Sequence, residues 1–149
     1  MLIMFISFAY SRGDTVDSPA MPRLADVMRP EPIVVAPEDT LGEVAERMTA
    51  VNVGAVIVKD FGRMIGILTE RDMLKAMAAR VHTSEARVRQ WMTEDPVTAP
   101  ADADCEEAAQ IMLEHGFRHL PVVDESGSVS GIVSLRRVVA ATKTAPDPA

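Results

Sequence analysis

A short polar segment that follows an apolar run is the clearest candidate for chemistry in this sequence. Gly66-Ile67-Leu68 has the character of a strand end, and Thr69-Glu70-Arg71-Asp72 that of a helix start. Exposed N–H groups at a helix start favour an anion such as phosphate. The Thr69 hydroxyl can bond a phosphate or a sugar, and the Asp72 carboxylate can accept hydrogen bonds from two neighbouring hydroxyl groups. One small ligand can therefore reach both side chains on this loop.

The same two residues have a second interpretation that needs no ligand. Threonine is a preferred N-cap residue, and an acid in the first turn of a helix interacts favourably with the helix dipole. On this reading Thr69 and Asp72 only begin the helix. The sequence leaves both interpretations open.

An equivalent segment, Ser134-Leu135-Arg136-Arg137, lies 65 positions further on, and Arg137 takes the place of Asp72 there. A guanidinium group cannot accept hydrogen bonds from hydroxyl groups. We therefore expect this second segment either to bind nothing or to bind phosphate, which arginine recognises through two parallel hydrogen bonds. The candidate phosphate partners are Arg118, Arg136 and Arg137. Alternatively, these arginines form surface ion pairs with the abundant acids.

Both segments belong to a longer internal repeat. An offset of 64 positions pairs Met28 with Met92, and after one inserted residue an offset of 65 pairs Gly66 with Gly131. Glycine, proline and apolar positions stay in step along the whole stretch. The chain is therefore predicted to be a duplicated unit.

Each copy predicts the element order β-α-β-β-α, from apolar runs bounded by turn residues and from apolar spacing at i, i+3, i+4 and i+7. In the first copy we expect strands at 33–35, 55–58 and 64–68 and helices at 40–51 and 69–80. In the second copy we expect strands at 97–99, 119–123 and 129–133 and helices at 104–115 and 134–142.

The fold class is therefore α+β, with two repeats at residues 21–80 and 91–143 and a linker at 81–90 that contains a short helix. A repeat of about 55 residues buries only a small core, so we expect the two to pack with pseudo-twofold symmetry. The cleft between them is the default ligand site. Residues 1–20 are expected to be disordered or a wrongly assigned start, and 144–149 a disordered tail.

Several motifs of the repeat resemble the CBS domain. They are the pattern Val-Met-x-x-x-Pro at 27–32, the apolar run at 54–58 and the segment at 66–72, with counterparts at 91–96, 120–124 and 131–134. The resemblance covers residues 25–143. It implies a free-standing CBS pair, or Bateman module, a class that commonly binds AMP, ADP, ATP, S-adenosylmethionine or related adenosine ligands.

The resemblance also implies a role for particular residues. Thr69 and Asp72 would hold the ribose of one full nucleoside site, which belongs to the first repeat, and the adenine would lie between apolar strand residues. The complete set of expected binding residues is Ile33, Val34, Ala55, Val56, Thr69, Asp72, Thr98, Arg118, His119, Pro121, Ser134, Arg136 and Arg137.

Composition narrows the classes of function. The net charge of −7 argues against a broad cationic surface for nucleic acid. The apolar residues 1–10 are too few to span a bilayer, which takes about 20, and they lack the features of a signal peptide. A single cysteine, Cys105, excludes an internal disulfide and a cysteine-based zinc site, and is expected to be a buried, inert thiol in a reducing, cytoplasmic compartment.

No nucleotide-binding glycine loop or zinc-protease motif is present, and His115 and His119 are not expected to share a helix face. We therefore expect no enzyme activity, no required cofactor and no metal. The leading hypothesis is a regulatory module that senses an adenosine ligand, forms a homodimer and signals to an unknown protein partner. The alternative is a nucleotide-independent structural or protein-interaction adaptor.

Overall fold

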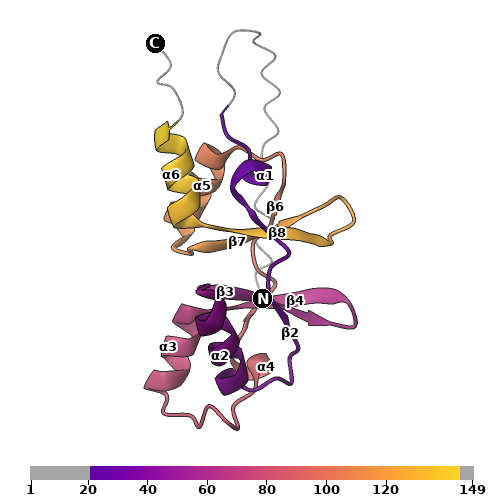
Figure 1. The fold of residues 1–149 in the computed structure, drawn as a ribbon, viewed down its shortest axis with the longest axis vertical. Coiled ribbons are helices and arrows are strands. Elements are labelled where there is room, and N and C mark those ends of the chain that lie inside the picture. Colours follow the sequence, from indigo (N-terminus) through magenta and orange to yellow (C-terminus); the bar gives the residue numbers. More distant parts are fainter. Residues whose placement is uncertain (1–20, 145–149) are drawn as a thin grey trace. The chain divides into compact units, whose positions relative to one another are not determined.

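The computed structural model describes residues 21–144, and they divide between two units (Figure 1). Unit 2 contains residues 31–96, and unit 1 contains the described residues up to Pro30 together with those from Val97 onward. The extension predicted at 1–20 and residues 145–149 of the predicted tail lie outside the described residues.

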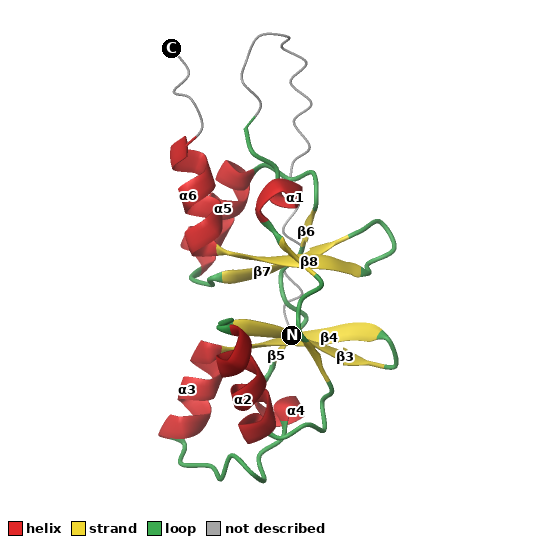
Figure 2. Cartoon of the chain, viewed as in Figure 1, coloured by secondary structure: helices red, strands yellow, loops and turns green. Residues whose placement is uncertain are grey.

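Unit 2 is a four-stranded sheet in the order β2-β3-β4-β5. Strand β2 is parallel to β3, and the pairs β3–β4 and β4–β5 are antiparallel. Its helices lie on one side of this sheet (Figure 2). Its elements are β2 (Val34–Val35), α2 (Leu41–Val51), β3 (Ala55–Asp60), β4 (Arg63–Thr69), α3 (Glu70–Ala78), α4 (Val88–Trp91) and β5 (Thr93–Glu94).

Unit 1 repeats this plan with a sheet in the order β1-β8-β7-β6. Strand β6 is parallel to β7, and the pairs β7–β8 and β1–β8 are antiparallel. Its elements are α1 (Leu24–Val27), β1 (Arg29–Pro30), β6 (Ala99–Pro100), α5 (Cys105–His115), β7 (His119–Val123), β8 (Val129–Ser134) and α6 (Leu135–Thr144).

The α+β class and the two tandem copies of β-α-β-β-α are confirmed; the structure shifts some element ends and adds three short elements that were not predicted, α1, β1 and β5. The second copy's first strand lies at Ala99–Pro100, later than the predicted 97–99, and α3 ends at Ala78 instead of residue 80. Arg80 has a left-handed backbone with φ of 59°, which ends the helical run before it. The short helix predicted in the linker is α4. The pseudo-twofold packing of the repeats stays a prediction.

Local sequence determines where the longer helices start and stop. The Thr40 hydroxyl accepts a hydrogen bond from the Glu43 N–H at 3.2 Å, while the Glu43 carboxylate accepts from the Thr40 N–H at 3.1 Å. This reciprocal capping box satisfies two N–H groups that the helix start leaves free. Helix α2 ends where Asn52 adopts a left-handed conformation, and α5 ends in the same way at Gly116.

The predicted apolar faces of α2 and α5 do form the cores. Val44 and Met48 belong to the core of unit 2, and Ala108 and Met112 to that of unit 1. None of the helices in the described part of the chain has the length and apolar character that crossing a lipid bilayer requires.

The first segment of each repeat joins the sheet of the other repeat. Strand β1 belongs to the first repeat but pairs with β8 of the second, with Arg29 opposite Ile132. Strand β5 belongs to the second repeat but pairs with β4 of the first, with Thr93 opposite Ile67. The two compact units therefore have different boundaries from the predicted sequence repeats. The repeats describe the duplication of the sequence, and their bounds stay a prediction.

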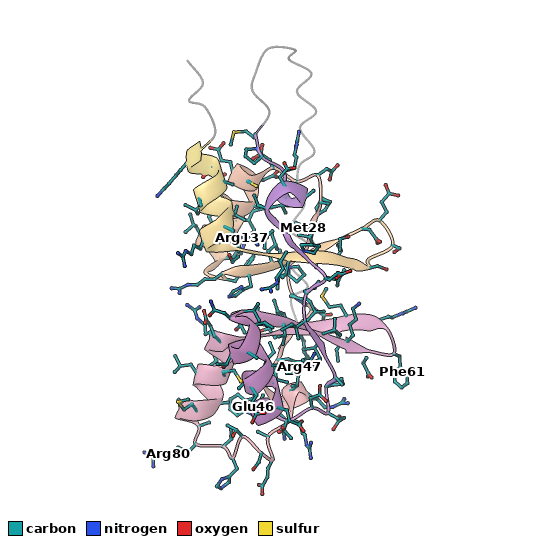
Figure 3. All side chains as sticks on the ribbon, in the orientation of Figure 1. Met28, Glu46, Arg47, Phe61, Arg80 and Arg137 are labelled. Carbon is teal, nitrogen blue, oxygen red and sulfur yellow. The ribbon has the colours of Figure 1, made fainter. Side chains whose placement is uncertain are left out.

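Two equivalent glycines allow these exchanged segments to come close. A Cβ atom at Gly66 would lie 2.7 Å from the Thr93 carbonyl oxygen, and one at Gly131 would lie 2.7 Å from the Arg29 carbonyl oxygen. The Met92 sulfur lies beside Gly66, as the Met28 sulfur does beside Gly131; Figure 3 labels Met28 next to β8. Glycine is needed at both positions because backbone oxygen atoms cannot move aside as a flexible side chain can.

We predict that Gly66→Ala and Gly131→Ala each lower the free energy of unfolding by about 1–3 kcal/mol, because the added methyl group forces the exchanged strand off the sheet. Urea denaturation measures the loss. A matched control is Gly127→Asn, since Gly127 has a φ of 83° with no atom near its missing Cβ and asparagine tolerates that conformation. Unchanged stability of Gly66→Ala would contradict the close approach of β5.

Candidate functional site

Thr69 and Asp72 begin α3 with a second capping box. The Asp72 N–H donates to the Thr69 hydroxyl oxygen at 3.2 Å. In return, Asp72 Oδ2 accepts from the Thr69 N–H at 2.9 Å and from the Thr69 hydroxyl at 3.1 Å. The helix-cap interpretation of these residues is therefore confirmed.

Burial distinguishes this capping box from the one at α2. The Glu43 side chain, which closes the α2 box, is exposed, whereas Asp72 is only 5% exposed and is the one buried charged residue in the described part of the chain. A carboxylate at a helix start needs no burial to act as a cap. Burial of a charge is costly unless hydrogen bonds compensate for it, so capping alone does not account for the position of Asp72.

Thr93 on β5 supplies a further contact to this carboxylate. Its hydroxyl oxygen lies 3.3 Å from Asp72 Oδ1 and 3.4 Å from Oδ2. A hydroxyl has one proton, so Thr93 donates to one of the two oxygens at a time. An ionised carboxylate has about four acceptor positions, and Oδ1 receives only the Thr93 contact from described residues. Asp72 therefore keeps acceptor capacity for a hydroxyl group of a ligand.

Sequence reasoning missed Thr93. The residue is 21 positions from Asp72 and lies at the start of the second repeat, and nothing in its spacing indicates that this segment crosses to β4. The available signal was the pairing of Met28 with Met92 and of Gly66 with Gly131. This pairing could have suggested that each glycine allows a methionine segment to approach closely. It could not have shown which of the two methionine segments lies beside which glycine.

The other candidates in unit 2 lie on neighbouring strands. Ala55 opens β3 directly opposite Thr69, so the structure brings Ala55, Thr69 and Asp72 together. Val56 is fully buried in the core of unit 2, which leaves its side chain no free surface for a ligand. Half-buried Ile33 and 38%-exposed Val34 belong to the β2 segment, on the far side of β3.

Most candidates of the second repeat lie at the start of α6 in unit 1, but Thr98 and Pro121 do not. The Ser134 hydroxyl oxygen accepts from the Arg137 N–H at 3.3 Å, so Ser134 caps the start of α6. The Leu135 N–H donates to the Arg118 carbonyl oxygen at 2.8 Å, and His119 lies opposite Ser134 in the β7–β8 pair. Thr98 precedes β6 and is half-buried, and Pro121 is buried within β7.

The three arginine side chains at this place are exposed. None of Arg118, Arg136 and Arg137 forms an ion pair with another described residue; the ion pair in the described part of the chain joins Arg89 to Glu38. The alternative interpretation of these arginines as partners in surface ion pairs is therefore not supported by the geometry.

Other groups that could perform chemistry are tied into the fold. No cluster of three or more histidine, cysteine or acidic side chains able to hold a metal ion occurs among residues 21–144. The His115 ring makes a local hydrogen bond to the Ile111 carbonyl oxygen. Cys105 is buried, as predicted. Burial raises the pKa of its thiol to about 11, and the nearby Asp104 and Asp26 carboxylates add to the effect.

We predict that native Cys105 reacts slowly with a thiol reagent at pH 8, because burial keeps the thiol protonated, and rapidly once urea unfolds the chain. The folded-state pKa lies above the unfolded value of about 8.5. The contribution of Cys105 to the free energy of unfolding is therefore fully present below that pH and is lost as the pH rises towards 11. Equal labelling rates with and without urea would contradict the buried position of the thiol. As a control, Cys105→Ser has no thiol to ionise, so its free energy of unfolding should not show this loss at alkaline pH.

A family model described as the CBS domain matches this chain twice, at residues 24–79 and 88–143. A 17.7 kDa protein of Acidianus ambivalens whose function is not assigned is 40% identical over 104 residues, which cover 69% of this chain and 62% of that protein. The chain thus spans about three fifths of the length of this relative, and the same holds for a relative from Methanopyrus kandleri.

Two solved structures with a similar fold were determined with adenosine compounds. The CBS domain pair of protein MJ0100, in complex with 5′-methylthioadenosine and S-adenosyl-L-methionine, has a TM-score of 0.73 and 26% identity, and covers 80% of this chain and 98% of that one. CBSX2 in complex with AMP has a TM-score of 0.66 and 27% identity, and covers 80% and 94%.

Proposed function

The chain belongs to the CBS-domain family, and on that premise we propose that it is a regulatory module that binds an adenosine-containing ligand. CBS pairs with a similar fold bind AMP in one case and methylthioadenosine and S-adenosylmethionine in the other. What these ligands share is an adenine attached to a ribose ring with two neighbouring hydroxyl groups, and they differ in the substituent at the 5′ carbon. We therefore place the recognition of the ligand at its ribose.

The buried carboxylate of Asp72 is the observation that supports this proposal. Two hydroxyl groups and a backbone N–H hold it in one orientation, and its Oδ1 retains acceptor capacity. A ribose diol can donate two hydrogen bonds to such a carboxylate, and bonds to a charged group are roughly twice as strong as neutral ones. Thr93 keeps the carboxylate in place, and Ala55 lies opposite Thr69 in the β3–β4 pair.

Regulation requires that the ligand bind two states of the protein with different affinities. Strand β4 ends at Thr69 and α3 begins at Glu70, so a ligand held by Thr69 and Asp72 stabilises this junction. We propose that the output passes to a partner protein or to a second copy of the chain in a homodimer, that the module acts in the cytoplasm, and that it needs neither a cofactor nor catalytic residues of its own.

A nucleotide-independent adaptor is the second candidate, and one observation favours it. The second repeat has Arg137 where the first has Asp72, so one of the two equivalent positions has lost the group that accepts hydrogen bonds from a sugar. If neither of the two equivalent positions bound a sugar, the chain would act through protein contacts alone. Unchanged binding to a partner protein across a nucleotide titration supports the adaptor.

We predict that one or more of AMP, ADP, ATP, S-adenosylmethionine and NAD raise the melting temperature of the purified chain. A ligand at about 100 times its dissociation constant adds roughly 2.7 kcal/mol, which corresponds to a shift of several degrees. Asp72→Ala should weaken the affinity at least about tenfold, because it removes the charged acceptor.

The matched control is Asp104→Ala. Asp104 caps α5 through a hydrogen bond from the Glu106 N–H at 2.7 Å, so its loss costs about 1 kcal/mol of stability without touching Asp72. This variant should melt at a lower temperature but keep the full ligand-induced shift. The absence of a shift with all five compounds, or an equal affinity of Asp72→Ala and wild type, would contradict the proposal and favour the adaptor.

A further inference from the structure

Two methionines lie at the close approaches of the exchanged strands. The Met92 sulfur is 3.0 Å from the position that a Cβ atom of Gly66 would take, and the Met28 sulfur is 2.8 Å from the corresponding position at Gly131. Each sulfur therefore packs where the neighbouring strand has no side chain. Each methionine also packs against the core of its unit, yet both are only half-buried. A small reagent in solution can therefore reach them.

The two methionines differ in what the following residue does. Thr93 follows Met92 directly, and its hydroxyl lies 3.3 Å from Oδ1 of the buried Asp72. In unit 1 the residue after Met28 is Arg29, which is exposed. Asp72 is the one buried charged residue in the described part of the chain, so no buried carboxylate among these residues depends on β1. A change at Met92 therefore reaches a candidate ligand group, and the same change at Met28 does not.

The chemistry available to a methionine side chain is oxidation of its thioether. Hydrogen peroxide converts it to the sulfoxide: the O–O bond breaks, one oxygen atom is transferred to the sulfur, and water leaves. The sulfur is oxidised by two electrons and the peroxide is reduced by two. At Met92 the added oxygen would have to fit between the β4 backbone at Gly66 and the apolar core of unit 2. A polar group buried there without a hydrogen bond is unfavourable.

We propose that Met92 is an oxidation site that controls the contact between β4 and β5. Formation of the sulfoxide releases β5 from β4, and Thr93 then no longer contacts Asp72. The carboxylate loses a donor that holds its orientation, so an adenosine ligand binds less tightly to the oxidised chain. This last consequence rests on the proposed function, whereas the release of β5 does not. A dithiol-dependent reductase reverses the step, because it returns the thioether and water while its dithiol becomes a disulfide.

Trp91 allows the release of β5 to be measured without a ligand. It is the single tryptophan of the chain, directly precedes Met92 and packs half-buried against the core of unit 2. After mild treatment with hydrogen peroxide, peptide mass spectrometry gives the extent of oxidation at each methionine. We expect the 70%-exposed Met77 to react first, the half-buried Met92 next and the fully buried Met112 last. Trp91 emission should shift to longer wavelength as Met92 reacts.

Matched variants assign this shift to a single sulfur atom. Met92→Leu keeps an apolar side chain of similar volume and leaves every other methionine and Cys105 in place, so peroxide should not shift its Trp91 emission. Met28→Leu and Met77→Leu should respond as the wild type does. The polar variant Met92→Gln should show the shifted emission without peroxide, whereas Met28→Gln should not.

The affinity for AMP, measured by isothermal titration, tests the link to the ligand. Oxidised wild type and untreated Met92→Gln should bind AMP at least about fivefold more weakly than untreated wild type, and oxidised Met92→Leu should keep its affinity. If the wild type binds no AMP but oxidation of Met92 shifts the Trp91 emission, the adenosine proposal is wrong and the oxidation site is supported. Unchanged emission once Met92 is fully oxidised, an equal shift in Met92→Leu, or an AMP affinity unaffected by oxidation would overturn the control by Met92.

Discussion

At Gly66 the backbone of β5 passes so close to β4 that a Cβ atom would lie 2.7 Å from the Thr93 carbonyl oxygen. The same approach recurs at Gly131 against the Arg29 carbonyl oxygen. Each contact allows the first segment of one repeat to complete the sheet of the other. A short helix goes with each segment, and its apolar residue, Leu24 or Val88, is fully buried in the unit that the segment joins. Neither sheet has its fourth strand without this contact.

The composition of both candidate sites follows from the exchange. Because β5 lies against β4, the Thr93 hydroxyl reaches the Asp72 carboxylate and helps to satisfy a charge that is almost fully buried. Because β1 lies against β8, Arg29 is brought to the position that corresponds to Thr93. The same geometry, used twice, places a hydroxyl beside a carboxylate in unit 2 and Arg29 at the corresponding position of unit 1.

Local patterns in the sequence were sufficient for the β-α-β-β-α elements of each copy and for half of the candidate site, but not for the short exchanged strands β1 and β5. The spacing of Val44 and Met48 predicted the buried face of α2, and Thr69 was recognised as a cap because capping depends on residues within one turn. Thr93 could not be found in this way, since its contact with Asp72 depends on a crossing between segments. The burial of Asp72 was not predictable for the same reason, as first-turn acids are ordinarily exposed.

The central claim is that Asp72 recognises the two hydroxyl groups of a ribose, and a comparison of AMP with 2′-deoxy-AMP by isothermal titration tests it most directly. The deoxy compound differs by one hydroxyl and leaves the base and phosphate unchanged. Loss of that hydroxyl deprives a buried carboxylate of a hydrogen bond, and the account predicts an affinity at least about tenfold lower for 2′-deoxy-AMP. Equal affinities of the two compounds would contradict it.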